Sequence, residues 1–269
     1  MMISNGIGLS PCPRRARAGS PALSLTARVH ALFGGAQGGM WDFTDPSTLR
    51  QMSNGTGAVA DGDPVGWAQD LSDNGNHLVQ AVAFKRPGFG WEGAGFDGVD
   101  DSFNSIDLFD LSATGELVVC VALDRPSPSA GRIIAEITSN SSVNAGTIAL
   151  FNGGNASIGV DRFRSRGTAN PAPVGFAEPG PNRAIISCVG RISPSMRVMR
   201  RNGVEGVNST SPQGTGTYGS WPLYIGSRGG DSEFFSGRIA RLVICGRLPS
   251  PEETALIEAW CDEPLRVLP

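Results

Sequence analysis

Histidine, lysine and paired cysteines are scarce in this sequence, and each shortage narrows the chemistry open to the chain. Only His30 and His77 are histidines, and Lys85 is the only lysine among 22 lysine and arginine residues. The five cysteines form no Cys-x-x-Cys pair, so the sequence supports neither a zinc site nor a disulfide framework. Most cysteines lie in apolar runs, where a free thiol packs as a small hydrophobe. This predicts folding in a reducing cytoplasm.

Long apolar runs are also missing. No stretch approaches the about 18 apolar residues that a membrane-spanning helix requires. Residues 1–20 do not show a charged segment followed by an apolar core, so we expect no secretory signal.

The N-terminal segment lacks acidic residues. Residues 1–40 contain no Asp or Glu, and their arginines are Arg14, Arg15, Arg17 and Arg28. Three roles fit this composition: a disordered tail, a contact to nucleic acid, and an arm that becomes ordered on a larger assembly. We expect no nucleic-acid binding, because no aromatic residues are interleaved with these arginines. We predict an attachment arm over residues 1–37.

Glycine and proline are abundant, at 37 and 19 of 269 residues. Many short β-rich runs lie between them, and such a turn-dense composition is typical of a sandwich rather than a helical bundle. The length fits one large all-β domain, predicted over residues 38–269, better than two domains.

The strand pattern is clearest near the C-terminus. Residues 238–245 alternate between two faces, and Ala240, Leu242 and Ile244 are predicted to share the apolar face that a sandwich buries. The opposite face is predicted to hold Ile239, Arg241, Val243 and Cys245.

A helix is predicted to follow this strand. Ser250 lies three residues before Glu253, with Pro251 between them, which indicates a capping box at a helix start. The helix is expected to pack through one apolar stripe and to end at Pro264. The stripe consists of Leu256, Ile257 and Trp260.

The stretch 221–261 resembles the C-terminal end of the concanavalin A-like, or laminin-G-like, jelly-roll family. It begins Trp-Pro-Leu-Tyr-Ile-Gly-Ser-Arg, and a polar loop after the glycine separates the last two strands before a small helix. The resemblance implies an all-β jelly-roll sandwich with a short C-terminal helix, preceded here by an extended N-terminal arm. Members of this family mostly bind sugars or other extracellular ligands, and a minority cleave them.

Residues 40–90 resemble a module common in bacteriophage structural proteins. The motifs are Trp-Asp-Phe-Thr-Asp-Pro-Ser-Thr-Leu at 41–49, Gly-Asp-Pro-Val-Gly at 62–66 and Asp-Leu-Ser-Asp-Asn-Gly-Asn-His at 70–77. Asp73 stands where the module usually has glycine. This resemblance implies a protein of a phage or of a phage-derived, gene-transfer-agent-like particle.

Short strands are predicted at regular intervals, as in a sandwich. Asn202-Gly203 predicts a type I′ hairpin leading to Val204, and the proline-rich segment 170–182 is expected to be a long exposed loop. The predicted strands are 116–124, 132–137, 146–151, 156–163, 183–191 and 196–201.

Acidic residues cluster in one segment. Residues 96–103 resemble the Phe-Asp-Gly-x-x-Asp turn of laminin-G-like domains, and short acidic side chains suit such a turn. Calcium binding is the alternative. We predict turn formation, with no metal and no cofactor. The acidic residues are Asp97, Asp100, Asp101, Asp107 and Asp110.

No catalytic motif is present. His77 has no Gly-x-Ser-x-Gly elbow to accompany it, and no cysteine lies in an electropositive exposed setting. The jelly-roll β-glucanases carry Glu-x-Asp-x-Glu on one strand, whereas Glu116, Glu136 and Glu205 are isolated here. We therefore predict that the protein is not an enzyme.

Sugar sites combine aromatic rings with amides, carboxylates and guanidinium groups, and an acidic polysaccharide would favour arginine. Such residues gather in two regions, around the Asn-Gly-Gly-Asn turn and around the glycine-rich loop before the last strand. The first region holds Asn152, Asn155, Asp161, Arg162, Arg164 and Arg166. The second holds Tyr218, Trp221, Arg228, Asp231 and Phe235.

Both regions also have structural interpretations. The asparagines can form a turn, the tryptophan can belong to the core, and the alternating arginines can line a solvated sheet edge. We predict one polysaccharide-binding surface formed by both loops. Its ligand-binding residues are predicted to be Asn152, Asn155, Arg162, Arg164, Trp221, Arg228 and Asp231.

Together these features predict a fibre or spike subunit displayed on a virion, made and folded in the bacterial cytoplasm. It would attach the particle to host capsule or lipopolysaccharide without cleaving it, with residues 1–37 bound to other virion proteins. Weak binding to repetitive glycans requires several copies, and we expect a homo-oligomer, trimeric by analogy with such fibres. The alternatives are a structural decoration or tail protein that binds no glycan and, from a third class, a polysaccharide depolymerase.

Overall fold

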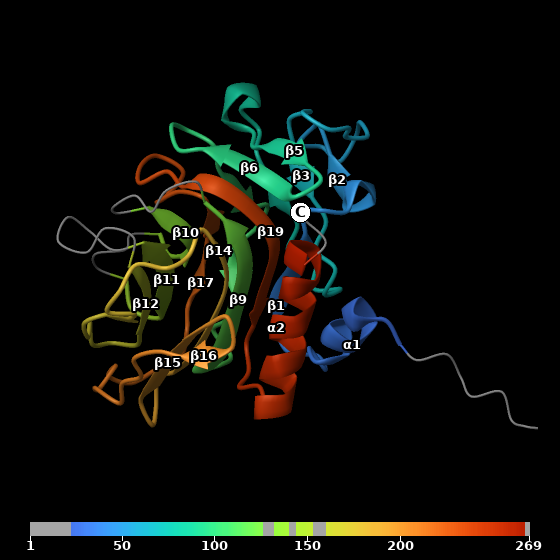
Figure 1. The fold of residues 1–269 in the computed structure, drawn as a ribbon. Coiled ribbons are helices and arrows are strands. Elements are labelled where there is room, and N and C mark those ends of the chain that lie inside the picture. Colours follow the sequence, from blue (N-terminus) through green and yellow to red (C-terminus); the bar gives the residue numbers. More distant parts are fainter. Residues whose placement is uncertain (1–22, 126–131, 140–143, 153–159, 267–269) are drawn as a thin grey trace, which may run out of the picture.

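The structure is a computed structural model that describes residues 23–125, 132–139, 144–152 and 160–266. These residues form two large antiparallel sheets, a two-stranded ribbon and two α-helices (Figure 1). The predicted all-β sandwich with a C-terminal helix is confirmed. Neither described helix has the length and apolar character needed to cross a membrane.

The first sheet has eight strands in the order β16-β15-β14-β9-β19-β6-β5, with β1 also paired to β19. At its centre the long strands β9, β14 and β19 pair across large sequence separations, whereas β5–β6, β14–β15 and β15–β16 pair consecutive strands. The bounds are β1 Gly38–Asp42, β5 Gly88–Gly90, β6 Gly93–Asp97, β9 Glu116–Asp124, β14 Arg183–Arg191, β15 Met196–Arg201, β16 Val204–Glu205 and β19 Ser236–Cys245.

The second sheet has nine shorter strands in the order β13-β12-β11-β10-β18-β7-β4-β3-β2. Strands β8 (Phe109–Asp110) and β17 (Ser220–Trp221) form the ribbon. The bounds in the second sheet are β2 Leu49–Arg50, β3 Trp67–Ala68, β4 Leu78–Val79, β7 Phe103–Ser105, β10 Ile133–Ile137, β11 Thr147–Asn152, β12 Asp161–Arg166, β13 Val174–Gly175 and β18 Leu223–Ile225.

Most predicted strands lie where the sequence pattern placed them. The strands at 116–124, 183–191 and 196–201 have the predicted bounds, and the hairpin at Asn202-Gly203 is confirmed, with φ values of 51° and 77°. The predicted strand 156–163 lies partly outside the described residues, and β12 occupies 161–166.

The prediction of an exposed loop over 170–182 is wrong in its middle. Val174 and Gly175 form β13 at the edge of the nine-stranded sheet, where Val174 pairs with Phe163. Val174 is buried. A single apolar residue among prolines gives no periodic signal, so this edge strand is visible only from its partner.

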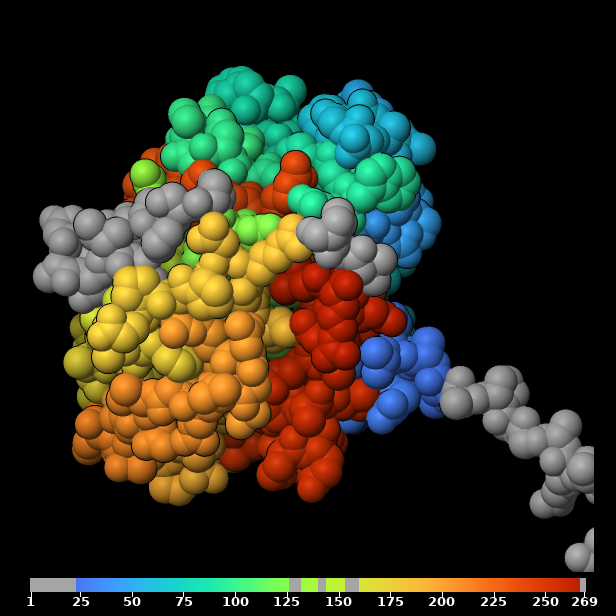
Figure 2. Space-filling view, in the orientation of Figure 1, coloured from blue at the N-terminus to red at the C-terminus, as the bar shows by residue number. Residues whose placement is uncertain are grey.

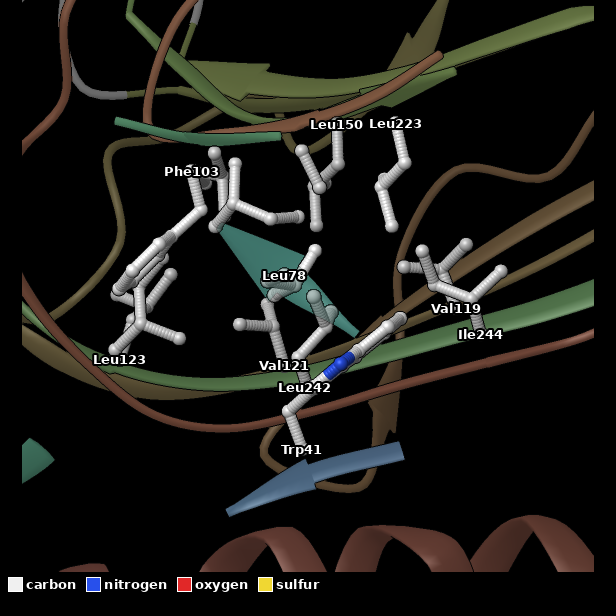
Figure 3. Close-up of a cluster of buried hydrophobic side chains, with 14 of the residues drawn as sticks. Trp41, Leu78, Phe103, Val119, Val121, Leu123, Leu150, Leu223, Leu242 and Ile244 are labelled. Atoms are coloured by element: carbon white, nitrogen blue, oxygen red, sulfur yellow. The ribbon is translucent and has the colours of Figure 1, made fainter. Parts of the chain in front are cut away.

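The main core lies between the two sheets (Figure 3). Val119, Val121 and Leu242 reach it from the eight-stranded sheet, and Leu150 and Leu223 reach it from the other. Each fully buried side chain of this size contributes about 1.5–3 kcal/mol of hydrophobic stabilisation, so this layer dominates the stability of the domain.

Strand β19 departs from the predicted alternation at one point. Its pairing with β9 shifts register between Ile239 and Arg241, which is a β-bulge. A bulge inserts one extra residue and exchanges the faces on either side of it. Ile239 therefore joins Leu242 in the inter-sheet core, and Ala240 faces the opposite side. The prediction was wrong for these two residues.

The two α-helices cover the outer face of the eight-stranded sheet. Helix α1 (Leu25–Ala31) and helix α2 (Pro251–Arg266) pack together there around Val29, Ile257 and Trp260. In Figure 2 the red helix α2 lies on the surface beside the blue α1. The described part of the predicted arm, residues 23–37, is thus a packed helix and turn rather than an extended segment.

Helix α2 begins at the predicted capping box but does not end at Pro264. The Ser250 amide donates to the Glu253 carboxylate at 2.8 Å, and the Glu253 amide donates to the Ser250 hydroxyl at 3.2 Å. Pro264 lies inside the helix. Its missing N–H leaves the Trp260 carbonyl, four residues earlier, without an intrahelical donor, and Arg241 donates to that carbonyl at 2.6 Å. This contact explains why the helix continues.

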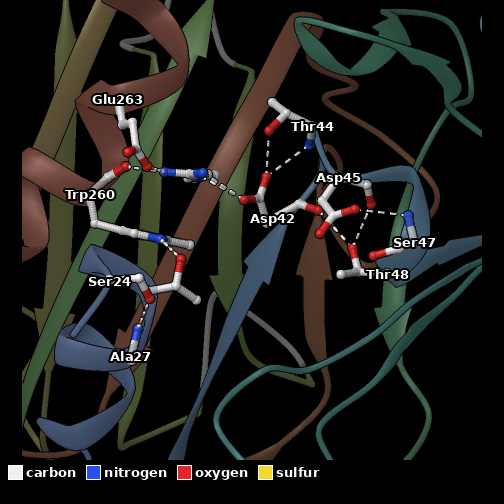
Figure 4. Close-up of polar contacts among 11 residues, drawn as sticks. Ser24, Ala27, Asp42, Thr44, Asp45, Ser47, Thr48, Trp260 and Glu263 are labelled. Carbon is white, nitrogen blue, oxygen red and sulfur yellow. Dashed lines mark hydrogen bonds and ion pairs between the residues drawn. The ribbon is translucent and has the colours of Figure 1, made fainter. Parts of the chain in front are cut away.

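Arg241 of β19 connects β1 to α2, and Figure 4 labels its partners Asp42, Trp260 and Glu263. Its guanidinium contacts the Asp42 carboxylate of β1 and the Glu263 carboxylate of α2, both at 2.8 Å. It also lies over the Trp260 ring, 4.6 Å from the ring centroid. The Arg241 side chain is 10% exposed and the Asp42 side chain is 8% exposed, so each charge depends on the other for compensation.

We predict that Arg241→Ala lowers the free energy of unfolding by about 3–5 kcal/mol, because it leaves the buried Asp42 charge without a partner. Urea unfolding followed by circular dichroism measures this loss. Arg266→Ala is the control: this side chain is 72% exposed, and its removal is expected to change stability by less than about 0.5 kcal/mol. Equal stability of the two variants would contradict the prediction.

Candidate ligand-binding site

One row of side chains crosses the outer face of the nine-stranded sheet. Residues paired in register point to the same face, and successive residues on a strand point to opposite faces. The residues next to this row in each strand lie in the inter-sheet core, so the row points away from the core. In order across the sheet it comprises Arg164, Ala149, Glu136, Tyr224, Asn104, Val79, Trp67 and Arg50.

Trp67 is held at one end of this row by the Asn-Gly-Asn-His motif. The His77 ring lies 4.8 Å from the Trp67 ring, and His77 Nδ1 accepts the amide N–H of Asp70 at 3.1 Å. Both contacts give His77 a structural role. Asp73 adopts a left-handed φ of 66°, a conformation that glycine adopts most readily.

Glu136 anchors the loop 226–235 over the other half of the row. Its Oε1 accepts the amide N–H of Gly229 at 2.9 Å, and its Oε2 lies 3.7 Å from Nε of Arg228 without a hydrogen bond. Arg228 also pairs with Glu233 at 2.6 Å. Glu136 is fully buried, and this burial raises the pKa of its carboxyl group.

Arg164 lies beside this loop. Its guanidinium is 5.6 Å from the centroid of the Phe151 ring, and its buried Nε has no hydrogen-bond partner. Burial lowers the pKa of Arg164, and the positive charges of Arg228 and Arg166 lower it further. The positive charges of Arg164, Arg166 and Arg228 therefore lie close enough to repel one another on this face.

The structure brings described residues of the two predicted regions to one end of the nine-stranded sheet. The Ile133 amide donates to the Glu233 carbonyl and the Asn152 amide donates to the Arg132 carbonyl, both at 2.9 Å, so the loop 226–235 and the end of β11 at Asn152 lie at the same end of the sheet. Arg162, Arg164 and Arg228 are half-buried at or near this end, and Asp231 is exposed. Asn155 lies outside the described residues.

Asn152 lies inside the protein rather than on a surface turn. It is 1% exposed, and its amide donates to Asp161 at 2.9 Å. Asp161 is also buried and forms ion pairs with Arg125 at 2.5 Å and Arg201 at 3.4 Å. The Asn152–Asp161 pair closes the β11–β12 ladder, so both side chains complete a buried polar network.

The aromatic candidates of the second region are separated from the arginines. Trp221 lies at the opposite end of β18 from Arg228, and its indole N–H donates to the Ala145 carbonyl at 3.1 Å. Tyr218 and Phe235 are buried core residues. The predicted single surface therefore does not include Trp221 in its arginine-rich part.

Sequence reasoning missed Glu136, Tyr224, Asn104 and Trp67. Glu136 had a usable signal, because it is the single charged residue in the apolar run Ile-Ile-Ala-Glu-Ile, and a lone charge in a buried strand needs a partner. The other three residues become neighbours only through sheet pairing, which local spacing does not reveal.

The acidic segment forms the expected turn contacts. Asp97 accepts the amide N–H groups of Val99 and Asp100 at 2.8 and 3.2 Å, and Asp101 accepts that of Asp97 at 2.9 Å. Carboxylate oxygens of Asp97, Asp100 and Asp101 lie within 4.8 Å of one another, and burial raises the pKa of Asp101 to about 7. These contacts account for the acids as turn residues; the absence of a metal stays a prediction.

The fold places the chain among antiparallel β-sandwiches. No family model and no curated protein matches the sequence. A GH54 α-L-arabinofuranosidase soaked with a cyclic sulfate inhibitor is similar in structure, with a TM-score of 0.57 and 12% identity over 87% of this chain and 64% of that chain. An arabinofuranosidase complexed with arabinofuranosyl-α-1,2-xylobiose has a TM-score of 0.51 and 14% identity over 73% of this chain and 50% of that one.

A heptameric SAP-like pentraxin from Limulus polyphemus is also similar, with a TM-score of 0.47 and 13% identity over 62% of this chain and 80% of that chain. The similarity to the two arabinofuranosidases concerns the fold alone.

We predict that Glu136→Ala releases the loop 226–235, because the Gly229 amide loses its acceptor and Arg228 loses a counter-charge. The free energy of unfolding is expected to fall by about 1–3 kcal/mol, and amide hydrogen exchange is expected to accelerate within the loop. Glu136→Gln keeps an acceptor oxygen and should retain most of the protection. Unchanged exchange in Glu136→Ala would show that Glu136 does not hold the loop.

Proposed function

We propose that this chain is a carbohydrate-binding β-sandwich without catalytic activity, and that its ligand lies along the outer face of the nine-stranded sheet. The observation that carries this proposal is the row across that face. It aligns two half-exposed aromatic rings, Trp67 and Tyr224, with the amide of Asn104 and the guanidinium of Arg164.

These groups suit a sugar chain. Aromatic rings pack against the apolar faces of sugar rings, while amide and guanidinium groups bond to hydroxyls. Neighbouring strands lie about 4.8 Å apart, so a row across several strands matches an extended oligosaccharide better than a compact ligand. The solved structures that share the fold include an arabinofuranosidase complexed with arabinofuranosyl-α-1,2-xylobiose, which supports a carbohydrate ligand for this sandwich.

The carboxyl groups of this face support binding rather than cleavage. A glycosidase needs two carboxyl groups that reach the scissile bond from both sides. Glu136 is fully buried and its Oε1 is engaged by Gly229, which fits a structural anchor. One observation favours the second candidate, a depolymerase: Glu136 has a raised pKa and shares Arg228 with Glu233. Release of reducing ends from a bound polysaccharide would establish that alternative.

Because residues 40–90 resemble a module of phage structural proteins, we also propose that the chain is a component of a phage-like particle. In this role the chain is a fibre or spike subunit of a phage-like virion that adheres to host capsule or lipopolysaccharide, made in the bacterial cytoplasm and present in several copies. Several copies raise avidity when each site binds weakly. A decoration or tail protein without glycan binding remains the structural alternative, and loss of assembly rather than of adsorption in a mutant would favour it.

We predict that Trp67→Ala and Tyr224→Ala each weaken glycan binding by about tenfold, because a stacking surface for one sugar ring is lost. A glycan array run with the full chain identifies a bound glycan, and calorimetry then measures the affinities. Trp91→Ala removes a more exposed tryptophan from the β5–β6 turn of the other sheet and should leave affinity unchanged. Equal effects of all three variants would refute the outer-face site.

We predict that deletion of residues 1–22 prevents incorporation into the particle while the sandwich still folds. The described residues 23–37 pack on the domain, so the deletion stops before Ser24, which caps α1. Purified particles are probed for the truncated chain, and its thermal unfolding is compared with that of the full chain. Normal incorporation of a folded truncation would reject the attachment role.

A further inference from the structure

Two arginines on the outer face of the nine-stranded sheet, Arg164 and Arg166, are not paired with acidic residues. Among the described residues, Arg164 and Arg166 form no ion pair. The segments outside the described residues contain no Asp or Glu. No acidic side chain elsewhere in the sequence can therefore neutralise these two guanidinium groups.

Their environment makes this imbalance costly. Arg166 is 6% exposed, and its Nε and Nη1 are buried without hydrogen-bond partners, as are Nε of Arg164 and Nε of Arg228. Burying a charged group without a partner is unfavourable by several kcal/mol. A group of unpaired N–H donors on one ligand-facing surface therefore favours an anion from outside the chain.

Other buried arginines of the protein have carboxylate, carbonyl or hydroxyl partners. Arg125 pairs with Asp161 and Arg241 pairs with Asp42. Arg197 has no carboxylate partner among the described residues, but its guanidinium donates to the Ala172 carbonyl and the Ser209 hydroxyl. Nε of Arg125 and Nε of Arg197 also lack a partner, but each of these guanidinium groups forms an ion pair or other hydrogen bonds. Arg164 and Arg166 differ because they form no ion pair or hydrogen bond with another described residue, and Arg228 adds a third positive charge beside them.

Two carboxylates of the protein itself already lie against one of these three arginines. Arg228 holds the half-exposed Glu233 carboxylate at 2.6 Å and lies beside that of Glu136. The planar guanidinium fork matches a carboxylate with two parallel hydrogen bonds. Tyr224 lies next to the same loop, because the Tyr224 ring would lie 3.9 Å from a Cβ on Gly230. A sugar ring on Tyr224 can thus direct a substituent toward the arginines.

We infer that the glycan bound on this face is acidic, and that a carboxylate on one of its sugar units binds at Arg164, flanked by Arg166 and Arg228. This inference rests on the proposed carbohydrate-binding function and specifies its ligand. Glu233 is the intramolecular carboxylate that the ligand competes with for Arg228. Binding is expected to weaken as salt concentration rises, because screening reduces charge attraction at a surface site.

The test compares acidic polysaccharides with their own neutral forms. Polygalacturonate, alginate and hyaluronan are each used before and after chemical reduction of the carboxyl groups to primary alcohols, and binding to the full chain is measured by calorimetry. At least one acidic form is expected to bind about tenfold or more tightly than its reduced form, the difference expected for hydrogen bonds to a charged group.

Arginine variants locate the effect. Arg164→Gln is expected to lower affinity for the acidic form to that for the reduced form, and Arg164→Lys, which keeps the charge but not the fork, should fall between them. Arg266→Gln removes one positive charge from α2, on the other side of the domain, and should have no effect. Thermal unfolding identifies a variant that fails to fold, and Arg228→Gln then provides the second measurement.

The outcomes separate this inference from the proposed function. Equal affinity for acidic and reduced forms, or binding confined to neutral glycans and sensitive to Tyr224→Ala, overturns the acidic ligand and leaves the carbohydrate site in place. An acidic preference that survives Arg164→Gln and Arg228→Gln overturns the assignment to these arginines. Absence of binding to every glycan on the array and to all three polysaccharides overturns both proposals.

Discussion

Strand β19 has to be buried on both of its faces, and the arrangement of the whole domain follows from this requirement. Its inner face contributes Leu242 and Ile244 to the core between the sheets, while Val243 and Cys245 on its outer face need a second cover. Helices α1 and α2 provide that cover, and Arg241 fixes it by pairing with β1 and α2 at once. Because both helices lie on the eight-stranded sheet, the nine-stranded sheet is the one that can present a polar face to a ligand.

The nine-stranded sheet uses this freedom through cross-strand pairing. Its strands are short, and eight of the nine each contribute one outward side chain to a row assembled from residues far apart in sequence. Glu136 has a separate role, since its buried carboxylate holds the loop 226–235 against the sheet through Gly229 and Arg228. The loop thereby places a third arginine near Arg164 and Arg166, and the resulting excess of positive charge makes this end of the face chemically distinct from the aromatic end at Trp67.

Only part of the candidate site could be recognised from sequence. Arg164 and Arg228 were predicted as ligand-binding residues, because polar residues around glycine-rich loops are a usable signal. Asn152 and Trp221 were placed on the same surface, yet the first completes a buried network with Asp161 and the second lies at the opposite end of β18. Glu136 and Tyr224 were missed. Alternation along a strand tells which residues share a face, but it does not tell which strands are neighbours, and that information decides a site built across a sheet.

Local interactions determined what the sequence alone could specify: the positions of the long strands, the hairpin at Asn202-Gly203, and the helix start at Ser250. Each depends on residues within a few positions of one another, so composition and spacing carry the signal. The tertiary structure decided the rest. The bulge that turns Ile239 into the core depends on pairing with β9. Helix α2 continues through Pro264 because Arg241 of β19 donates a hydrogen bond to the Trp260 carbonyl, which Pro264 leaves without an intrahelical donor. The partners in both cases are distant in the chain, and only the folded arrangement brings them together.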